Sequence, residues 1–157
     1  MLYLKYLYYI LKHKYYVFVE CMKLGLWWRG ITHDLSKFRW SECKPYAQRF
    51  FGSNDKPKKD FSKGWCKHKN RNDHHPEYWI LDGEPLEMSK IARKEMLADW
   101  KAMGKQRNNN VLEYYENAGR YKPFGEKTRI WLENMIGYNK YDKQMQIPFT
   151  NYQNIRR

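Results

Sequence analysis

The segment MSKIARKEMLADWKAMG, residues 88–104, decides the fold class. At 100° per residue its side chains separate into a basic face (Lys90, Lys94 and Lys101) and an apolar face (Ala92, Met96, Trp100 and Met103). This period predicts an amphipathic α-helix from Ser89 to Met103, with Gly104 as the residue that ends it. The segment therefore favours a helical protein.

The rest of the chain also favours helices, because the alternation typical of strands never persists and β-branched residues are few. Residues 2–24 predict one long helix that ends at Gly25, and Ser41 is placed to cap a helix that stops at Gly52. Further helical segments are expected at 33–38, 65–70, 110–118 and 126–138, with loops at 52–60 and 81–86. The predicted fold is an all-α helical bundle, with one domain over residues 1–145 and an irregular tail at 146–157.

Charge and cysteine usage indicate the partners and the compartment. The chain of 157 residues has 30 basic and 17 acidic side chains, a net charge of +13, which favours nucleic acid, nucleotides or anionic lipid as partners. Cys21, Cys43 and Cys66 form no CxxC pair, so we expect a reducing, cytoplasmic location. Lysines interrupt the first segment before any uncharged run reaches the ~18–20 residues that cross a bilayer. No membrane partner is expected, and the broad apolar face of the first helix suits a core or a homodimer interface.

One carboxylate lies on the apolar face of the 89–103 helix. Asp99 is nearly opposite the lysines, and Glu95 flanks the same face one turn earlier. A carboxylate that faces a core needs a cation, hydrogen-bond donors or a metal ion, because burying it unpaired is costly. A salt bridge is the simpler interpretation, and a metal site is the alternative that the histidines favour.

All histidines lie in the N-terminal half of the chain, at His13, His33, His68, His74 and His75. Imidazole and carboxylate groups together suit divalent Mn, Fe, Co and Zn. His33 and Asp34 are neighbours that can bind one ion from the end of a helix. The His74–His75 pair would equally suit a surface loop, and His13 is expected at the edge of the Lys5–Lys12–Lys23 stripe rather than within the buried face.

The order of these residues resembles the HD-domain superfamily of metal-dependent phosphohydrolases, which is all-helical, so the resemblance implies an HD-domain-like helical bundle. In that family a first histidine, a His-Asp doublet and a final aspartate hold a divalent ion, and here they correspond to His13, His33–Asp34 and Asp99. HDLSK, residues 33–37, is similar to the HDxxK doublet of the subgroup that cleaves cyclic dinucleotides. There the lysine faces substrate phosphate, and a histidine followed by an HH pair completes a two-metal site. His68 and His74–His75 occur in that order.

A closer resemblance is to uncharacterised small proteins of phages and bacteria. The shared pieces read here HKYYVFVECMKLGLWWRGITHDLSKFRWSECKPYAQRFF (13–51), HKNRNDHHPEYW (68–79) and EMLADW (95–100). A phage-encoded member would act in the host cytoplasm.

The resemblance and the residues predict a metal-dependent phosphohydrolase or phosphodiesterase that acts on a nucleotide or cyclic (oligo)nucleotide. One or two divalent ions (Mn, Fe, Co, Zn or Mg) would activate water for attack on phosphorus. The expected ligands are His13, His33, Asp34, Asp99, His68, His74 and His75, of which the last three could instead bind substrate phosphate. The expected catalytic residues are Asp34, Lys37 and Glu95. Glu42 and Glu95 could act as general bases or support the ligands, and Glu77 could orient a histidine through its other ring nitrogen. Substrate contacts are expected from Lys37, Arg29, Lys69, Arg71, Trp28 and Tyr78, although all but Lys37 would equally suit a solvated surface or a packed core.

The alternative is a non-enzymatic basic helical protein that binds nucleic acid and uses the histidines for a structural metal. It requires basic residues massed on one face, whereas lysine and arginine are spread through the whole chain. A membrane-surface protein is disfavoured because the charged stripe of the first helix is narrow.

Overall fold

The structure, a computed structural model, describes residues 1–52 and 58–138 and confirms the all-α fold class. The expected tail at 146–157 and the expected domain boundary at 145 lie outside the described residues. In chain order the elements are α1 (Leu2–Lys23), α2 (Trp27–Thr32), the 3₁₀ helix η1 (Leu35–Phe38), α3 (Trp40–Phe51), α4 (Lys58–Lys69), η2 (Pro76–Trp79), β1 (Ile80–Leu81), β2 (Glu84–Pro85), α5 (Lys90–Arg107), α6 (Val111–Asn117), η3 (Gly119–Tyr121) and α7 (Glu126–Ile136).

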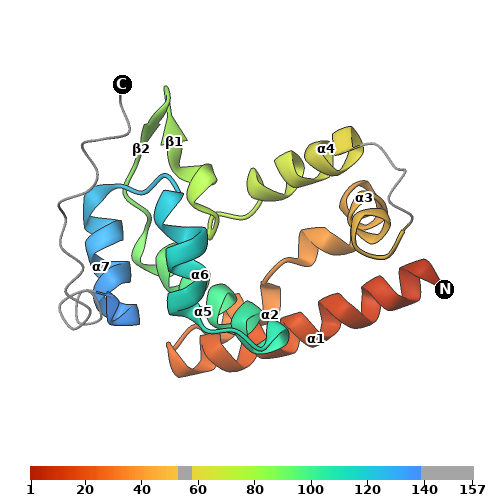
Figure 1. Cartoon of the computed structure of the whole chain (residues 1–157), viewed down its shortest axis with the longest axis horizontal. Coiled ribbons are helices and arrows are strands. Elements are labelled where there is room, and N and C mark those ends of the chain that lie inside the picture. The colour runs from red at the N-terminus through yellow and green to blue at the C-terminus, as the bar shows by residue number, and fades with distance from the viewer. Residues whose placement is uncertain (53–57, 139–157) are drawn as a thin grey trace, which may run out of the picture.

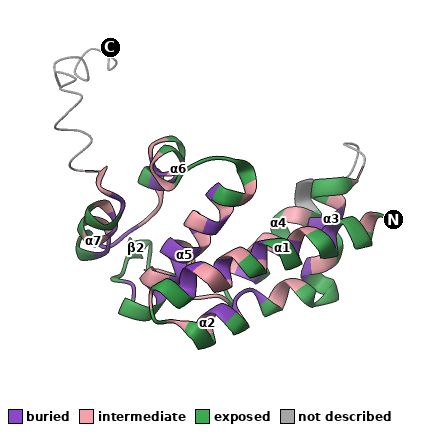
Figure 2. Ribbon diagram, turned by 90° about the horizontal axis from the view of Figure 1, so that it is seen from below, coloured by how far each residue is buried: buried purple, intermediate pink, exposed green. Residues whose placement is uncertain are grey.

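Helices α1 and α5 form the centre of the fold. α1 packs against α5, α2 and α3, and α4 packs against α3 (Figure 1). α5 also packs against α6 and α7, so that it lies between α1 and the C-terminal helices (Figure 2). Residues carried by α1, α4 and α5 can therefore reach one shared interior region.

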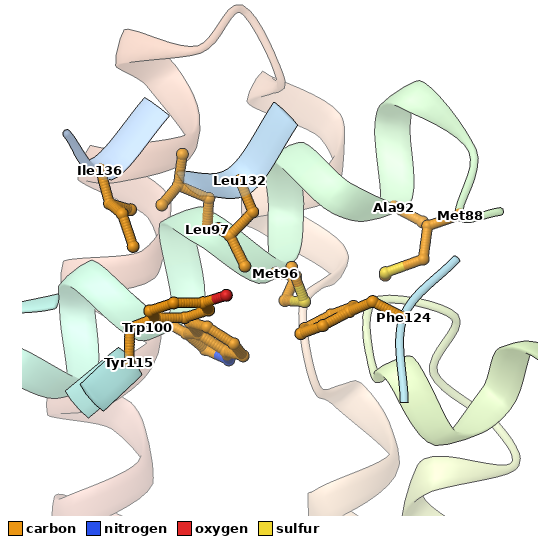
Figure 3. Close-up of a cluster of buried hydrophobic side chains, with 9 residues drawn as sticks. All are labelled: Met88, Ala92, Met96, Leu97, Trp100, Tyr115, Phe124, Leu132 and Ile136. Carbon is orange, nitrogen blue, oxygen red and sulfur yellow. The ribbon is translucent and has the colours of Figure 1, made fainter. Parts of the chain in front are cut away.

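Among residues 1–52 and 58–138, the buried apolar side chains form three clusters, and His13 and Asp99 lie between them. The largest joins α5 to α6 and α7 and includes Met96, Leu97 and Trp100 (Figure 3). The second joins α1 to α3, and the third joins α1 to α5 through Val17, Cys21, Ala98 and Ala102. His13 on α1 falls between the second and third clusters, and Asp99 on α5 falls between the third and the first.

Small side chains bring α1, α2 and α5 close together. Ala98 and Ala102 of α5 are fully buried against α1. Gly30 has the same role in α2, because a Cβ at this position would lie 3.0 Å from the Cys21 Cβ. Short residues at helix contacts reduce the distance between helix axes, so polar side chains from all three helices can reach a common centre.

One face of α1 is buried along its whole length. Figure 2 shows buried and exposed stretches alternating along α1. The buried residues recur every three or four positions and are Tyr6, Ile10, His13, Val17, Glu20 and Cys21. This recurrence is the period of an amphipathic helix packed on a core. Within residues 1–52 and 58–138 no helix has both the length and the apolar character that crossing a bilayer requires.

Helix α5 is longer than the sequence predicts. It spans Lys90–Arg107, so the expected end at Gly104 is wrong. This glycine allows a close contact instead, since a Cβ on it would lie 2.7 Å from the Asn109 carbonyl oxygen. The helix ends at Asn108, which takes the left-handed conformation with φ 54°.

Other boundaries also differ from the predictions. α2 was not predicted, because six residues are too few to display a helical period. α3 begins at Trp40 without a side-chain cap, so the expected Ser41 cap is wrong. α4 starts inside the expected 52–60 loop and is longer than the predicted 65–70 segment. The 81–86 segment forms a hairpin whose turn, Asp82–Gly83, has positive φ at both residues, as a type I′ turn requires.

Glu20 provides a prediction about stability and pH. It is buried on α1 and accepts hydrogen bonds from Lys105 and Lys23. Burial alone would raise the pKa of Glu20, but the two lysines outweigh it and hold the pKa below its ordinary value. A carboxyl whose pKa is lower in the folded state stabilises that state above its unfolded pKa, and this contribution disappears as pH falls through the folded pKa.

We therefore expect Glu20→Gln to lower the free energy of unfolding by about 1 kcal/mol at pH 7, since both lysines are partly exposed, and by less at pH 3. Urea unfolding of both proteins at the two pH values measures the difference. Glu113→Gln, an exposed site on α6, is the matched control. An equal loss at both pH values would show that charge has no part in the effect.

Candidate metal centre

The His33–Asp34 doublet lies at the break between α2 and η1. His33 ends α2 in an extended conformation, and Asp34 then takes the left-handed conformation with φ 53° and ψ 26°. Aspartate and asparagine adopt this conformation more readily than most other residues. The reversal directs both side chains inward, where His33 is 1 % and Asp34 6 % exposed. The doublet therefore contacts the interior from the end of a helix, as the sequence predicts.

The first half of the site joins α1, the doublet and α5. His13 Nε2 lies 2.8 Å from Asp99 Oδ1, while its Nδ1 lies 3.1 Å from Gln106 Oε1. His33 Nε2 lies 3.3 Å from Asp34 Oδ2 and 3.8 Å from Asp99 Oδ1. A cavity of about 10 Å³ adjoins His13, His33 and Asp34, which is room for one water-sized or ion-sized occupant.

The second half uses the other oxygen of Asp34. Asp34 Oδ1 lies 3.4 Å from His68 Nε2 and 3.5 Å from His74 Nε2. His75 Nε2 is 2.9 Å from His68 Nε2, and one ligand atom from each of these four residues falls within 4.8 Å of the others. Asp34 therefore stands between two groups of imidazoles, with a different carboxylate oxygen toward each.

Glu95 orients one histidine of each half. Its Oε1 lies 2.9 Å from His33 Nδ1 and 3.3 Å from His74 Nδ1, and its Oε2 pairs with Arg29. Arg29 also pairs with Asp73, one residue before His74. A carboxylate on Nδ1 fixes the imidazole with its Nε2 lone pair directed away, which is how ligand histidines are held in metal sites.

Glu42 performs the same task for His68. Its Oε2 lies 3.1 Å from His68 Nδ1 and accepts from the Ser36 hydroxyl at 2.8 Å. Its Oε1 accepts from Arg71 at 2.5 Å. Like Glu95, Glu42 is buried and held by an arginine at the surface. Both halves thus have a buried carboxylate that supports the ligand atoms.

The charges of the site suit a cation. Burial opposes ionisation, yet nearby imidazoles and Lys37 hold the pKa of Asp34 well below its ordinary value, and hydrogen bonds from His33 and His74 bring the pKa of Glu95 to about 2. Burial also lowers the pKa of His68 and His75, so their nitrogen lone pairs are available at neutral pH. Asp34 and the other carboxylates overcome burial at His33 and raise its pKa to about 10, which reflects the negative potential at the centre.

Several buried atoms at the centre lack a hydrogen bond. They include both oxygens of Asp34 and the Nε2 atoms of His33 and His74, although the Lys37 ammonium lies 2.6 Å from Asp34 Oδ2. Unsatisfied buried polar atoms are costly, and cations bound in the two halves would satisfy all four. The residues present therefore fit a metal ion, since buried imidazoles and carboxylates are close enough to bind one.

All seven expected ligands meet at this centre. His13 is 3 % exposed, so its expected place outside the buried face is wrong: α5 packs over that side of α1. His74 is fully buried, which excludes the surface-loop interpretation for it. The sequence did not indicate Gln106 or Ser36, because neither type of side chain marks a metal site by itself.

The expected substrate contacts are dispersed. Lys37 lies at the centre, whereas Arg29 and Arg71 are paired with the supporting carboxylates Glu95 and Glu42. Trp28 and Tyr78 are exposed and Lys69 is half-buried, and within residues 1–52 and 58–138 none of these three side chains forms a hydrogen bond or ion pair with the cluster. Glu77, expected to support a histidine, pairs with Lys122 instead.

The fold and the site define an all-α protein with a buried histidine–carboxylate centre able to hold metal. The chain belongs to a family of unknown function, DUF5662, whose model matches residues 2–138. Neither the curated proteins nor the solved structures provide a significant match.

Proposed function

We propose that the protein is a metal-dependent phosphohydrolase or phosphodiesterase whose substrate is a nucleotide. The observation that carries the proposal is the position of Asp34, which has one oxygen toward His33 and the other toward His68 and His74. A carboxylate between two ligand groups is suited to two adjacent ions, the arrangement that assists in-line displacement at phosphorus.

Two divalent ions would be held by the two halves of the centre. His13, His33, Asp99 and Oδ2 of Asp34 would hold one, and His68, His74, His75 and Oδ1 of Asp34 the other. Bound there, the ions would lower the pKa of a coordinated water and polarise a phosphoryl oxygen. The donor set of imidazole nitrogens and carboxylate oxygens suits Mn, Fe, Co or Zn better than Mg.

Lys37 and Glu95 have different tasks in this proposal. Lys37 is near Asp34 and also lines the adjoining pocket, so its ammonium can bind the substrate phosphate. Glu95 has both oxygens occupied by His33, His74 and Arg29, which makes it a positioning residue rather than the catalytic residue predicted from the sequence. In the reaction, a water oxygen bonds to phosphorus, the ester P–O bond breaks, and a proton from that water ends on the departing hydroxyl.

The alternative is a basic protein that binds nucleic acid around a structural metal. Structural metal sites are closed by protein ligands, whereas His75, Asp99 and Lys37 of this centre line an adjoining pocket. A centre that is open to a pocket supports catalysis over a structural role.

The test combines metal analysis with a substrate panel. Purified protein should retain up to two equivalents of divalent metal, and with Mn²⁺ it should hydrolyse at least one of a panel of nucleoside monophosphates, cyclic mononucleotides and cyclic dinucleotides. EDTA should abolish product formation and excess Mn²⁺ should restore it. Absence of tightly bound metal, or salt-dependent DNA or RNA binding that EDTA leaves unchanged without any hydrolysis, would overturn the proposal.

A further inference from the structure

A pocket of about 260 Å³ adjoins the metal centre. Its walls come from α3 and α4 on one side and from α5 and α6 on the other. His75, Asp99 and Lys37 contribute both to the pocket wall and to the centre. A ligand in this pocket would therefore reach the ions directly.

The walls of the pocket are aromatic. Phe61 and Trp65 come from α4, and Trp100 and Tyr114 come from α5 and α6. Trp100 and Tyr114 contact each other edge to face, with ring centroids 4.8 Å apart. Aromatic surfaces on both sides suit a planar ligand group, and stacking of a nucleobase on such a side chain contributes about 1–3 kcal/mol.

Cations lie at both ends of the pocket. Lys122 belongs to the end near the metal centre, because its Nζ is 5.8 Å from the Trp65 ring, which in turn is 5.1 Å from the ring of His75. Arg107 lies eight residues after Asp99 on α5, which is about 12 Å along a helix. Lys122 pairs with Glu77, whereas the Arg107 side chain has no hydrogen bond or ion pair within the part of the chain that the structure describes.

We infer that this pocket binds a single nucleotide with its phosphate at the metal centre and its base toward Arg107. Lys37 and Lys122 bind the phosphate, the aromatic side chains enclose the base, and Arg107 with Asn109 contacts the edge of the base. The inference rests on the proposed function, and it specifies the substrate of the proposed enzyme as a mononucleotide. The volume of about 260 Å³ lies just below the usual range for ligand pockets, about 300–1,000 Å³, which disfavours a cyclic dinucleotide.

The test measures binding separately from hydrolysis. Nucleoside 5′-phosphonates, in which a methylene group replaces the ester oxygen, and inorganic phosphate are titrated into the Mn²⁺-loaded protein by calorimetry. We expect Arg107→Ala to weaken phosphonate binding about 10-fold and to leave inorganic phosphate unchanged. Lys122→Met should weaken the binding of both the phosphonate and inorganic phosphate. Lys90→Ala, an exposed lysine at the start of α5, is the control and should alter neither.

The outcomes separate the two proposals. Binding that follows this pattern without hydrolysis of any ester would support the pocket assignment and overturn the enzymatic function. If the protein shows metal-dependent hydrolysis but Arg107→Ala changes neither phosphonate affinity nor KM, the proposed function stands and the pocket assignment is overturned. Tighter binding of a cyclic dinucleotide than of any mononucleotide would also overturn it.

Discussion

Replacing Asp34 with asparagine is expected to lower the proposed nucleotide hydrolysis at least ~10³-fold, which corresponds to about 4 kcal/mol of transition-state stabilisation. The change removes the negative charge that stands between the two imidazole groups, so neither half of the centre keeps its full set of anionic ligands. Asparagine has nearly the shape of aspartate and tolerates the left-handed backbone at φ 53°, which alanine does not. Steady-state kinetics with Mn²⁺ measures the activity, and elemental analysis measures the retained metal.

The control for this variant is Asp60→Asn, which removes the same charge from an exposed position on α4. It should keep full activity and full metal content. Far-UV circular dichroism of both metal-free variants should show unchanged helix content, because α1 and α5 are held mainly by apolar packing. If Asp34→Asn keeps its metal and more than a tenth of its activity, Asp34 does not bridge two ions.

The convergence of the ligands was predicted from the resemblance to the HD-domain superfamily, and only part of it had a local signal. Asp99 faces the apolar side of an amphipathic helix, where a carboxylate needs a cation, donors or a metal ion, and His33 and Asp34 are neighbours in the sequence. The burial of His13 could not be predicted in the same way. A helical wheel describes one helix alone, and the partner that covers His13 is α5, which is 86 residues away. Tertiary packing decides which polar residue at the edge of a face becomes buried.

The pocket was not predictable for a related reason. Trp65, Tyr114 and Arg107 lie on three different helices, and only the assembled fold brings them to one cavity. Trp28 and Tyr78, which were expected to contact the substrate, are exposed and do not line this pocket. Gly104 is a further example. From the sequence alone it is expected to end a helix, but in the fold its missing Cβ allows close contact with the backbone of Asn109, which lines the pocket.

The second large effect is expected from replacing the supporting carboxylates Glu95 and Glu42. Loss of Glu95 should weaken the binding of two ions, and loss of Glu42 the binding of one. Glu95→Gln should weaken metal binding about 10- to 100-fold at both halves, because Glu95 orients His33 in one and His74 in the other. Glutamine has one acceptor oxygen and a donor amide, so either Arg29 or the two histidines then face an N–H group. Titration with Co²⁺, followed through its visible absorption bands, resolves the affinity and the coordination geometry of each ion.

Glu42→Gln is the matched comparison, since Glu42 supports His68 alone among the ligands. A loss of similar size should appear at the His68 half only, and the spectrum of the ion at His13 and His33 should stay as in the unmodified protein. A general loss of stability cannot produce this difference, because it would affect both halves in both variants. If both variants weaken the binding of the same single ion, or if neither changes the Co²⁺ spectrum, then these carboxylates do not set the orientation of the ligands.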